Sequence, residues 1–308
     1  MLDDHQREIV ENINLFCQSL KLSKTTKSNL NSFVGDIFAI DSLGLTQFEL
    51  SFKFNKAIKD DSKMRLLNLD SKAYSYRNKG AYLKRLDSYF DIFQKNNINL
   101  QLDTLHEALK SVSDDPMDVY IGADIENEDY QFAIWLILGG ALRSGKINLK
   151  KNSVEIIDKL FKRLGFNPSF EITQNILNIG FDIDNNDLYY KIYYFLNKDN
   201  YHQMNSEERR IVGELIGLLK SEHKYWFFAS ERYKKGGLGV GRKKLYLEFL
   251  DDLYLNKKET LDLIEEILTI MRCEYNKETF RDVFRGINAR LVILAIEDDG
   301  VVTFYIRL

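Results

Sequence analysis

Alternating apolar and polar residues recur in pairs of short stretches along the chain, and turn residues separate the two members of each pair. Such pairs are typical of antiparallel β-hairpins. The pattern predicts five hairpins, at 32–54, 119–138, 177–196, 224–250 and 288–308. The second and third align without a gap at an offset of 58 residues and share Ile-Gly, Asp-Ile and an acidic-Asn turn. A repeat of fixed period indicates a repeated supersecondary unit.

Helical periodicity fills the segments between these hairpins, with apolar residues three and four positions apart. The predicted helices lie at 5–20, 81–94, 102–112, 153–165, 171–177, 206–220, 259–271 and 278–287. Closing ten strands into a barrel would remove unpaired edges, and helices outside would cover the outward apolar side chains. We therefore predict an α+β fold: a ten-stranded antiparallel β-barrel built from five ααββ repeats and surrounded by helices, in one domain over residues 1–308.

The composition narrows the possible partners and location. A net charge of −3 provides no basic field for nucleic acid. The sequence contains no run of about 18 apolar residues, so it predicts no membrane span, and it does not start with a hydrophobic signal segment. Cys17 and Cys273 sit in helical patterns and are expected as buried thiols in a reducing compartment. The sequence therefore predicts a cytoplasmic protein, expected as a monomer, that binds neither nucleic acid nor membrane.

The polar rows of the predicted strands share a Lys-x-Tyr pattern, seen in Lys191-Ile192-Tyr193 and in Lys244-Leu245-Tyr246. A strand sends alternate residues to opposite faces, so these rows face the interior if the barrel closes and water if it does not. The rows carry the cations Lys53, Lys191, Lys244 and Arg307, the aromatic residues Trp135, Tyr189, Tyr193, Tyr246 and Tyr305, and the acids Asp36, Glu49, Asp124, Asp182 and Glu248. Cations can hold phosphates, aromatic faces stabilise positive charge, and a carboxylate can accept a proton.

With its ααββ pattern and Lys-x-Tyr rows, the chain resembles the ABBA-type (PT-barrel) prenyltransferases and is most similar to the cyanobactin-type peptide prenyltransferases. The most specific likeness runs through residues 82–128, and the NIGFD of 178–182 resembles a family strand. The resemblance implies a prenyl diphosphate co-substrate with Mg2+. It also implies transfer of a dimethylallyl or geranyl group to a side chain of a ribosomally made cyclic or linear peptide.

The resemblance also assigns roles to residues. It implies that Lys53, Lys191, Lys244 and Arg307 bind the diphosphate and that Trp135, Tyr189, Tyr193, Tyr246 and Tyr305 form an aromatic shield. It also implies a catalytic carboxylate that accepts a proton, for which Asp36 and its neighbour Glu49 are the candidates. Glu49 and Ala133 stand where the family carries cations. A degenerate barrel that binds peptide or ligand without transfer is therefore the alternative.

A third alternative is a P-loop-like NTPase. The stretch GALRSGKI at 140–147 nearly fits the phosphate-binding loop pattern. However, Ile147 stands where a Ser or Thr hydroxyl must reach Mg2+, and the next predicted helix begins several residues late. The glycine-rich GGLGVG at 236–241 lies between two predicted strands, so we expect a hairpin loop rather than a dinucleotide site.

Overall fold

A computed structural model provides the three-dimensional structure of the chain. It describes residues 3–19, 21–40, 46–54, 64–70, 79–95, 101–114, 118–126, 129–141, 147–149, 151–166, 176–184, 187–196, 206–219, 224–234, 244–273, 281, 284, 287–297 and 301–308.

The described helices are α1 (Asp4–Ser19), α2 (Lys24–Ile40), α3 (Lys79–Lys95), α4 (Gln101–Lys110), α5 (Ser153–Leu164), α6 (Ser206–Leu218) and α7 (Lys258–Ile270). The strands are β1 (Thr46–Phe54), β2 (Met64–Asp70), β3 (Asp118–Glu126), β4 (Asp129–Ile137), β5 (Gly139–Ala141), β6 (Ile147–Leu149), β7 (Ile176–Asp184), β8 (Asp187–Phe195), β9 (Tyr225–Lys234), β10 (Lys244–Tyr254), β11 (Arg290–Glu297) and β12 (Val302–Arg307).

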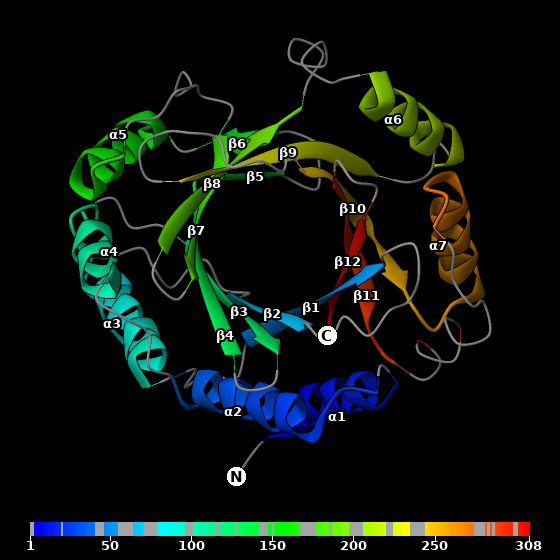
Figure 1. Ribbon diagram of the computed structural model, residues 1–308, viewed down its shortest axis with the longest axis horizontal. Coiled ribbons are helices and arrows are strands. Elements are labelled where there is room, and N and C mark those ends of the chain that lie inside the picture. Colours follow the sequence, from blue (N-terminus) through cyan, green and yellow to red (C-terminus); the bar gives the residue numbers. More distant parts are fainter. Residues whose placement is uncertain are drawn as a thin grey trace.

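Antiparallel strands close into a barrel in the order β1-β12-β11-β10-β9-β8-β7-β4-β3-β2. Strand β1 completes the circle because it pairs with β2 on one side and with the C-terminal β12 on the other. The helices form a layer around the strands (Figure 1). The prediction of antiparallel strands that curl into a barrel inside a layer of helices is therefore confirmed.

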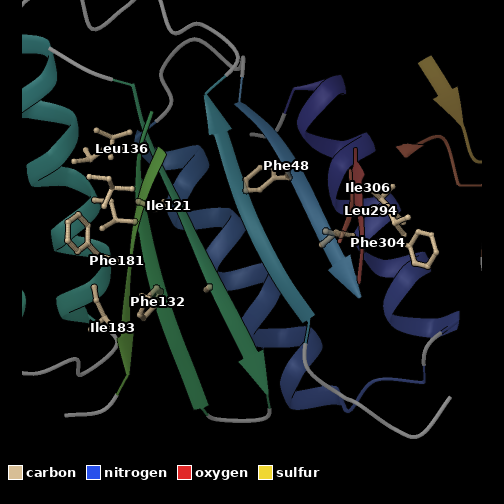
Figure 2. Packing of buried hydrophobic residues seen from close by; sticks show 14 of the residues in the cluster. Phe48, Ile121, Phe132, Leu136, Phe181, Ile183, Leu294, Phe304 and Ile306 are labelled. Carbon is tan, nitrogen blue, oxygen red and sulfur yellow. The ribbon is translucent and has the colours of Figure 1, made fainter. Parts of the chain in front are cut away.

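Outward-facing strand side chains pack against the helices in one large hydrophobic cluster, part of which Figure 2 shows. The rings of Phe33 on α2 and Phe93 on α3 lie 5.9 and 4.7 Å, centroid to centroid, from the ring of Phe132 on β4. Phe38 of α2 meets Phe48 of β1 edge-on at 5.6 Å. Burial of each such side chain contributes roughly 1.5–3 kcal/mol. These contacts fix which row of each strand is left to face the interior.

The first predicted hairpin is wrong in its first arm. Residues 32–40 lie in helix α2, whose buried side chains Leu30, Phe33, Val34 and Ile37 recur at helical spacing. The second arm is confirmed as β1, which pairs with the unpredicted β2. The other four predicted hairpins are confirmed as β3–β4, β7–β8, β9–β10 and β11–β12.

The predicted five-fold ααββ repeat is met only in part. Two helices precede β1–β2 and β3–β4, whereas one complete helix is described before each of the later hairpins. The predicted helix at 171–177 is wrong at its end, because Ile176 and Leu177 begin β7. Of the predicted helix at 278–287, residues 281 and 284 are described as helical.

A small two-stranded sheet of β5 and β6 follows the barrel strand β4. It occupies the two ends of the stretch that resembles a phosphate-binding loop. Such a loop must lead from a strand into a helix, but here Ile147 begins a strand, and α5 starts only at Ser153. The GGLGVG stretch, like the middle of this one, lies outside the described residues.

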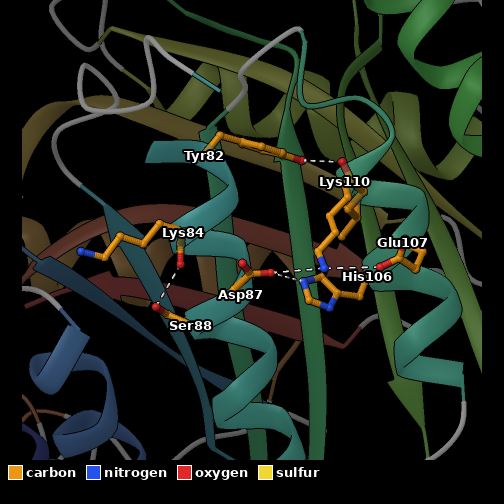
Figure 3. Close-up of polar contacts among 8 residues, drawn as sticks. Tyr82, Lys84, Asp87, Ser88, His106, Glu107 and Lys110 are labelled. Atoms are coloured by element: carbon orange, nitrogen blue, oxygen red, sulfur yellow. Dashed lines mark hydrogen bonds and ion pairs between the residues drawn. The ribbon is translucent and has the colours of Figure 1, made fainter. Parts of the chain in front are cut away.

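Polar contacts join α3 to α4 outside the barrel, as Figure 3 shows. His106 Nε2 lies 2.8 Å from Asp87 Oδ1, and its ring stacks on Phe90 at 4.2 Å. Burial lowers the pKa of His106. The buried Tyr82 hydroxyl donates to the Leu109 carbonyl at 3.1 Å. These contacts hold two helices together and lie away from the barrel interior. Within the described part of the chain, no helix has both the length and the apolar character needed to cross a membrane.

Candidate functional site

A second hydrophobic cluster consists of strand residues alone. Its buried members are Ala133, Trp135, Leu177, Tyr193, Phe228, Tyr246, Val292, Ala295 and Tyr305. Because the helices pack on the outer face of the sheet, this cluster lies on the inner face. The inward direction predicted for Trp135, Tyr193, Tyr246 and Tyr305 thus agrees with the structure.

Five inner rings form what we call the aromatic belt: Trp135, Tyr193, Phe228, Tyr246 and Tyr305. Phe228 and Tyr246 stack with their planes 2° apart and their centroids 4.5 Å apart. The ring of Tyr246 also lies 5.8 Å from Tyr193 and 6.3 Å from Tyr305. Trp135 Nε1 donates to the hydroxyl of Tyr193 at 3.1 Å. The belt therefore crosses strands β4, β8, β9, β10 and β12 and presents ring faces that can stabilise a cation.

The belt requires a glycine at position 180. A Cβ added to Gly180 would lie 2.7 Å from Trp135 Nε1 and 2.8 Å from its Cδ1. Gly180→Ala is therefore expected to displace the indole and to lower the free energy of unfolding by about 1–3 kcal/mol, measured by urea denaturation. Gly213→Ala on α6 is the control, because a Cβ there meets nothing within 4 Å and alanine favours a helix. Equal stability of the two variants would contradict the close packing of Trp135 on Gly180.

Three inward cations from neighbouring strands lie beside the belt, and we call Lys191, Arg232 and Lys244 the cationic group. Lys191 and Arg232 are opposite each other in the β8–β9 register. Lys191 Nζ lies 2.7 Å and Arg232 Nε 3.3 Å from the same carboxylate oxygen of Asp182. Lys244 Nζ lies 2.5 Å from Oε1 of Glu297, its register partner on β11. Each cation is thus held by a carboxylate from a neighbouring or nearby strand.

Tyr189 lies beside the cationic group and is not part of the aromatic belt. The Arg232 guanidinium carbon lies 4.0 Å from the centre of the Tyr189 ring. The Tyr189 hydroxyl donates to Asp187 Oδ2 at 3.3 Å. Its predicted place on the inward row of β8 is consistent with these contacts.

Glu49 and Glu248 form a carboxylate pair on the other side of the belt. Arg307 donates to Oε1 of Glu49 from Nη2 at 2.6 Å and from Nε at 3.2 Å. Trp226 Nε1 donates to Oε2 of Glu248. Burial, together with the negative charge of Glu49, raises the pKa of Glu248 to about 7, although the Trp226 hydrogen bond and the charge of Arg307 act in the opposite direction. This carboxyl can therefore exchange a proton near neutral pH.

Strand β10 carries one member of each of the three groups. On β10 the inward row reads Lys244, Tyr246 and Glu248. A strand rises about 3.3 Å per residue, so the cationic group and the carboxylate pair are roughly 13 Å apart along the strand, with the belt between them. The interior thus separates a positively charged end from a proton-accepting end.

Three predicted site residues depart from this arrangement or lie beyond description. Arg307, predicted to bind the diphosphate with Lys191 and Lys244, instead pairs with Glu49 on the other side of the belt. Asp36 is not on a barrel strand: it lies on α2 and pairs with Lys95 of α3, with 3.0 Å between Oδ1 and Nζ. The prediction that it is a catalytic carboxylate on a barrel strand is therefore wrong in its location, because residues 32–40 continue the helical period of α2. Lys53 lies on β1 opposite Thr303, and its side chain is outside the described part of the structure.

Arg232, Glu297, Trp226 and Phe228 complete the interior but were not predicted as site residues. Strand β9 reads YWFFASERYK, so Trp226, Phe228 and Arg232 lie on one row by simple alternation. The Lys-x-Tyr pattern drew attention only to the second strand of each hairpin.

A resident metal site does not emerge from the described side chains. No three His, Cys, Asp or Glu residues among them lie together as a metal site would require. Mg2+ is often held by one or two carboxylates plus substrate phosphates. The implied Mg2+ stays a prediction, and we assign no chemical step to it.

The class of fold is thus a closed antiparallel barrel, surrounded by helices, with an aromatic and charged interior. Among solved structures, it is similar to 5-dimethylallyltryptophan synthase from Streptomyces coelicolor, with a TM-score of 0.64 and 11% identity over 98% of this chain and 96% of that one. A 6-dimethylallyl tryptophan synthase gives a TM-score of 0.64 and 12% identity over 97% and 95% of the two chains. AnaPT from Neosartorya fischeri gives 0.56 and 11% over 99% and 94%.

These similarities establish the shared fold over nearly the whole length of each chain. No protein-family model and no curated protein matches the sequence.

Proposed function

We propose that this protein is a prenyltransferase that moves an allylic group from its diphosphate to an acceptor inside the barrel. The observation that carries the proposal is the order Lys244, Tyr246, Glu248 along the inward row of β10. A cationic end suits the diphosphate, an aromatic belt suits a carbocation, and a carboxylate suits the acceptor's proton. The similarity in fold to two dimethylallyltryptophan synthases supports the same reaction class.

The reaction comprises the cleavage of one bond, the formation of another and a proton transfer. The bond between C1 of the allyl group and the diphosphate oxygen breaks, and its electron pair leaves with the diphosphate on the cationic group. The aromatic belt stabilises the allylic cation, and an electron pair of the acceptor forms the new bond to it. A proton then passes from the acceptor to Glu49 or Glu248. The products are the prenylated acceptor and pyrophosphate.

We further propose a dimethylallyl donor and an acceptor side chain on a ribosomally made peptide, of the kind that the cyanobactin-type enzymes use. The likeness of residues 82–128 and 178–182 to that family supports this choice. Geranyl diphosphate is the second donor to test.

The decisive experiment incubates the protein with dimethylallyl diphosphate and peptides that carry Tyr, Trp, Ser, Thr, Arg, Lys or His, followed by mass spectrometry. Parallel reactions contain free tryptophan, Mg2+ or EDTA. A mass gain of one C5H8 unit on a peptide is expected. A gain on free tryptophan alone would overturn the peptide proposal. No gain with either donor on any acceptor would overturn the proposed transfer.

One observation favours a second function, a barrel that binds its ligands without transfer. Every cation of the cationic group already contacts a carboxylate. If no transfer occurs, binding of the same peptides, measured by calorimetry, is the expected result for this second function.

A further inference from the structure

The cationic group carries its own counter-ions. Asp182 forms ion pairs with both Lys191 and Arg232, and Glu297 forms an ion pair with Lys244. Three cations and two carboxylates leave a net charge of +1 when all are ionised. A diphosphate would therefore approach a site that is largely neutralised.

Burial makes these pairings strong competitors for any anion. Lys191 is 8% exposed and Glu297 is 3% exposed. A buried charge without a partner is costly, so the empty site needs the two carboxylates. The same ammonium and guanidinium groups must bind phosphate oxygens when the donor enters. Carboxylates and phosphate then compete for one set of hydrogen-bond donors.

We propose that Asp182 and Glu297 are built-in competitors of the diphosphate. They hold Lys191, Arg232 and Lys244 in place while the site is empty, weaken the binding of the diphosphate, and take the cations back when pyrophosphate leaves. This inference rests on the proposed function for the identity of the anion. It assigns to two acids of the interior a role in anion affinity rather than in proton transfer.

Calorimetric titration with inorganic pyrophosphate tests the proposal on the full chain. Asp182→Asn and Glu297→Gln keep the shape of each side chain and remove its charge. Each is expected to bind pyrophosphate about ten- to a hundredfold more tightly than the unmodified protein. Affinity that is unchanged or weaker in both variants would overturn the proposal.

Asp187→Asn is the matched control for a general change in charge. Asp187 lies on the same hairpin as Asp182, but it is half exposed and pairs with Lys234 at 2.9 Å, outside the cationic group. Its removal should leave the affinity for pyrophosphate within about twofold of the unmodified protein, as expected for an exposed pair. An equal gain in this variant would assign the effect to overall charge and overturn the proposal.

Removal of a buried carboxylate also destabilises the empty protein, so a second measurement is needed. Pyrophosphate should raise the thermal midpoint of Asp182→Asn and Glu297→Gln more than it raises that of the unmodified protein, because tighter binding stabilises the folded state. The two proposals fail in different ways. If the variants bind pyrophosphate more tightly but no transfer occurs, only the proposed transferase activity is contradicted. If the unmodified protein transfers the prenyl group but the variants do not bind more tightly, only the proposed competition by Asp182 and Glu297 is contradicted.

Discussion

Lys191→Ala and Lys244→Ala should each lower kcat/KM for the allylic diphosphate by about 100- to 1,000-fold. Each ammonium lies on the inward row beside the aromatic belt, Lys191 next to Tyr193 and Lys244 next to Tyr246. In the proposed reaction, negative charge on the diphosphate grows as the C1–O bond breaks. Loss of an ammonium therefore costs more in the transition state than in the bound substrate. Steady-state kinetics with a prenylated product as the readout would measure the effect.

The controls separate charge from packing. Lys162→Ala on α5 removes a lysine whose side chain is 77% exposed and lies outside the barrel, and it should keep full activity. Lys191→Met and Lys244→Met keep the length of the side chain and should be as inactive as the alanine variants. If both alanine variants retained full activity, the diphosphate would bind elsewhere and the assignment of the cationic group would fail.

Local periodicity predicted four of the barrel hairpins because a pleated strand fixes the face of every residue. The inward rows of β8, β10 and β12 could be read directly from sequence for the same reason. The prediction failed for the first hairpin, where the alternation of apolar and polar residues is weakest. Residues 32–40 follow a helical period more closely than an alternating one, and β2, which reads MRLLNLD, places Leu66 beside Leu67 and so breaks the alternation.

Local sequence patterns could not predict which acid pairs with which cation. Glu49 and Arg307 are 258 residues apart in sequence and meet only because β1 and β12 close the barrel. Lys244 meets Glu297 because of the β10–β11 register. The alternation along each strand predicted that most of these side chains face the interior. Strand order and register, which alternation does not reveal, decide which acid neutralises which cation. In the proposed reaction, the diphosphate must displace these carboxylates from the cations.

The stability of the protein should fall by about 2 to 3 kcal/mol between pH 4.5 and pH 7 through Glu248 alone. The pKa of this carboxyl rises from 4.5 to about 7 on folding, first through burial and then through the nearby charge of Glu49. Between these two values the folded chain holds the proton more often than the unfolded chain does. A rise in pH therefore favours unfolding across this window, and the small remaining loss from Glu248 ends about one pH unit above it. Urea denaturation at several pH values measures the slope.

Glu248→Gln should remove this part of the slope, because the amide does not titrate but can still accept the Trp226 hydrogen bond. Glu155→Gln, an exposed glutamate on α5, is the control and should leave the slope unchanged. The same proton bears on the proposed reaction, since only the ionised carboxylate can accept the acceptor's proton. If Glu248 is that base, kcat/KM should rise with pH through about 7 in the unmodified protein and lose this rise in Glu248→Gln. A variant that kept the rise would contradict the assignment of Glu248 as the base.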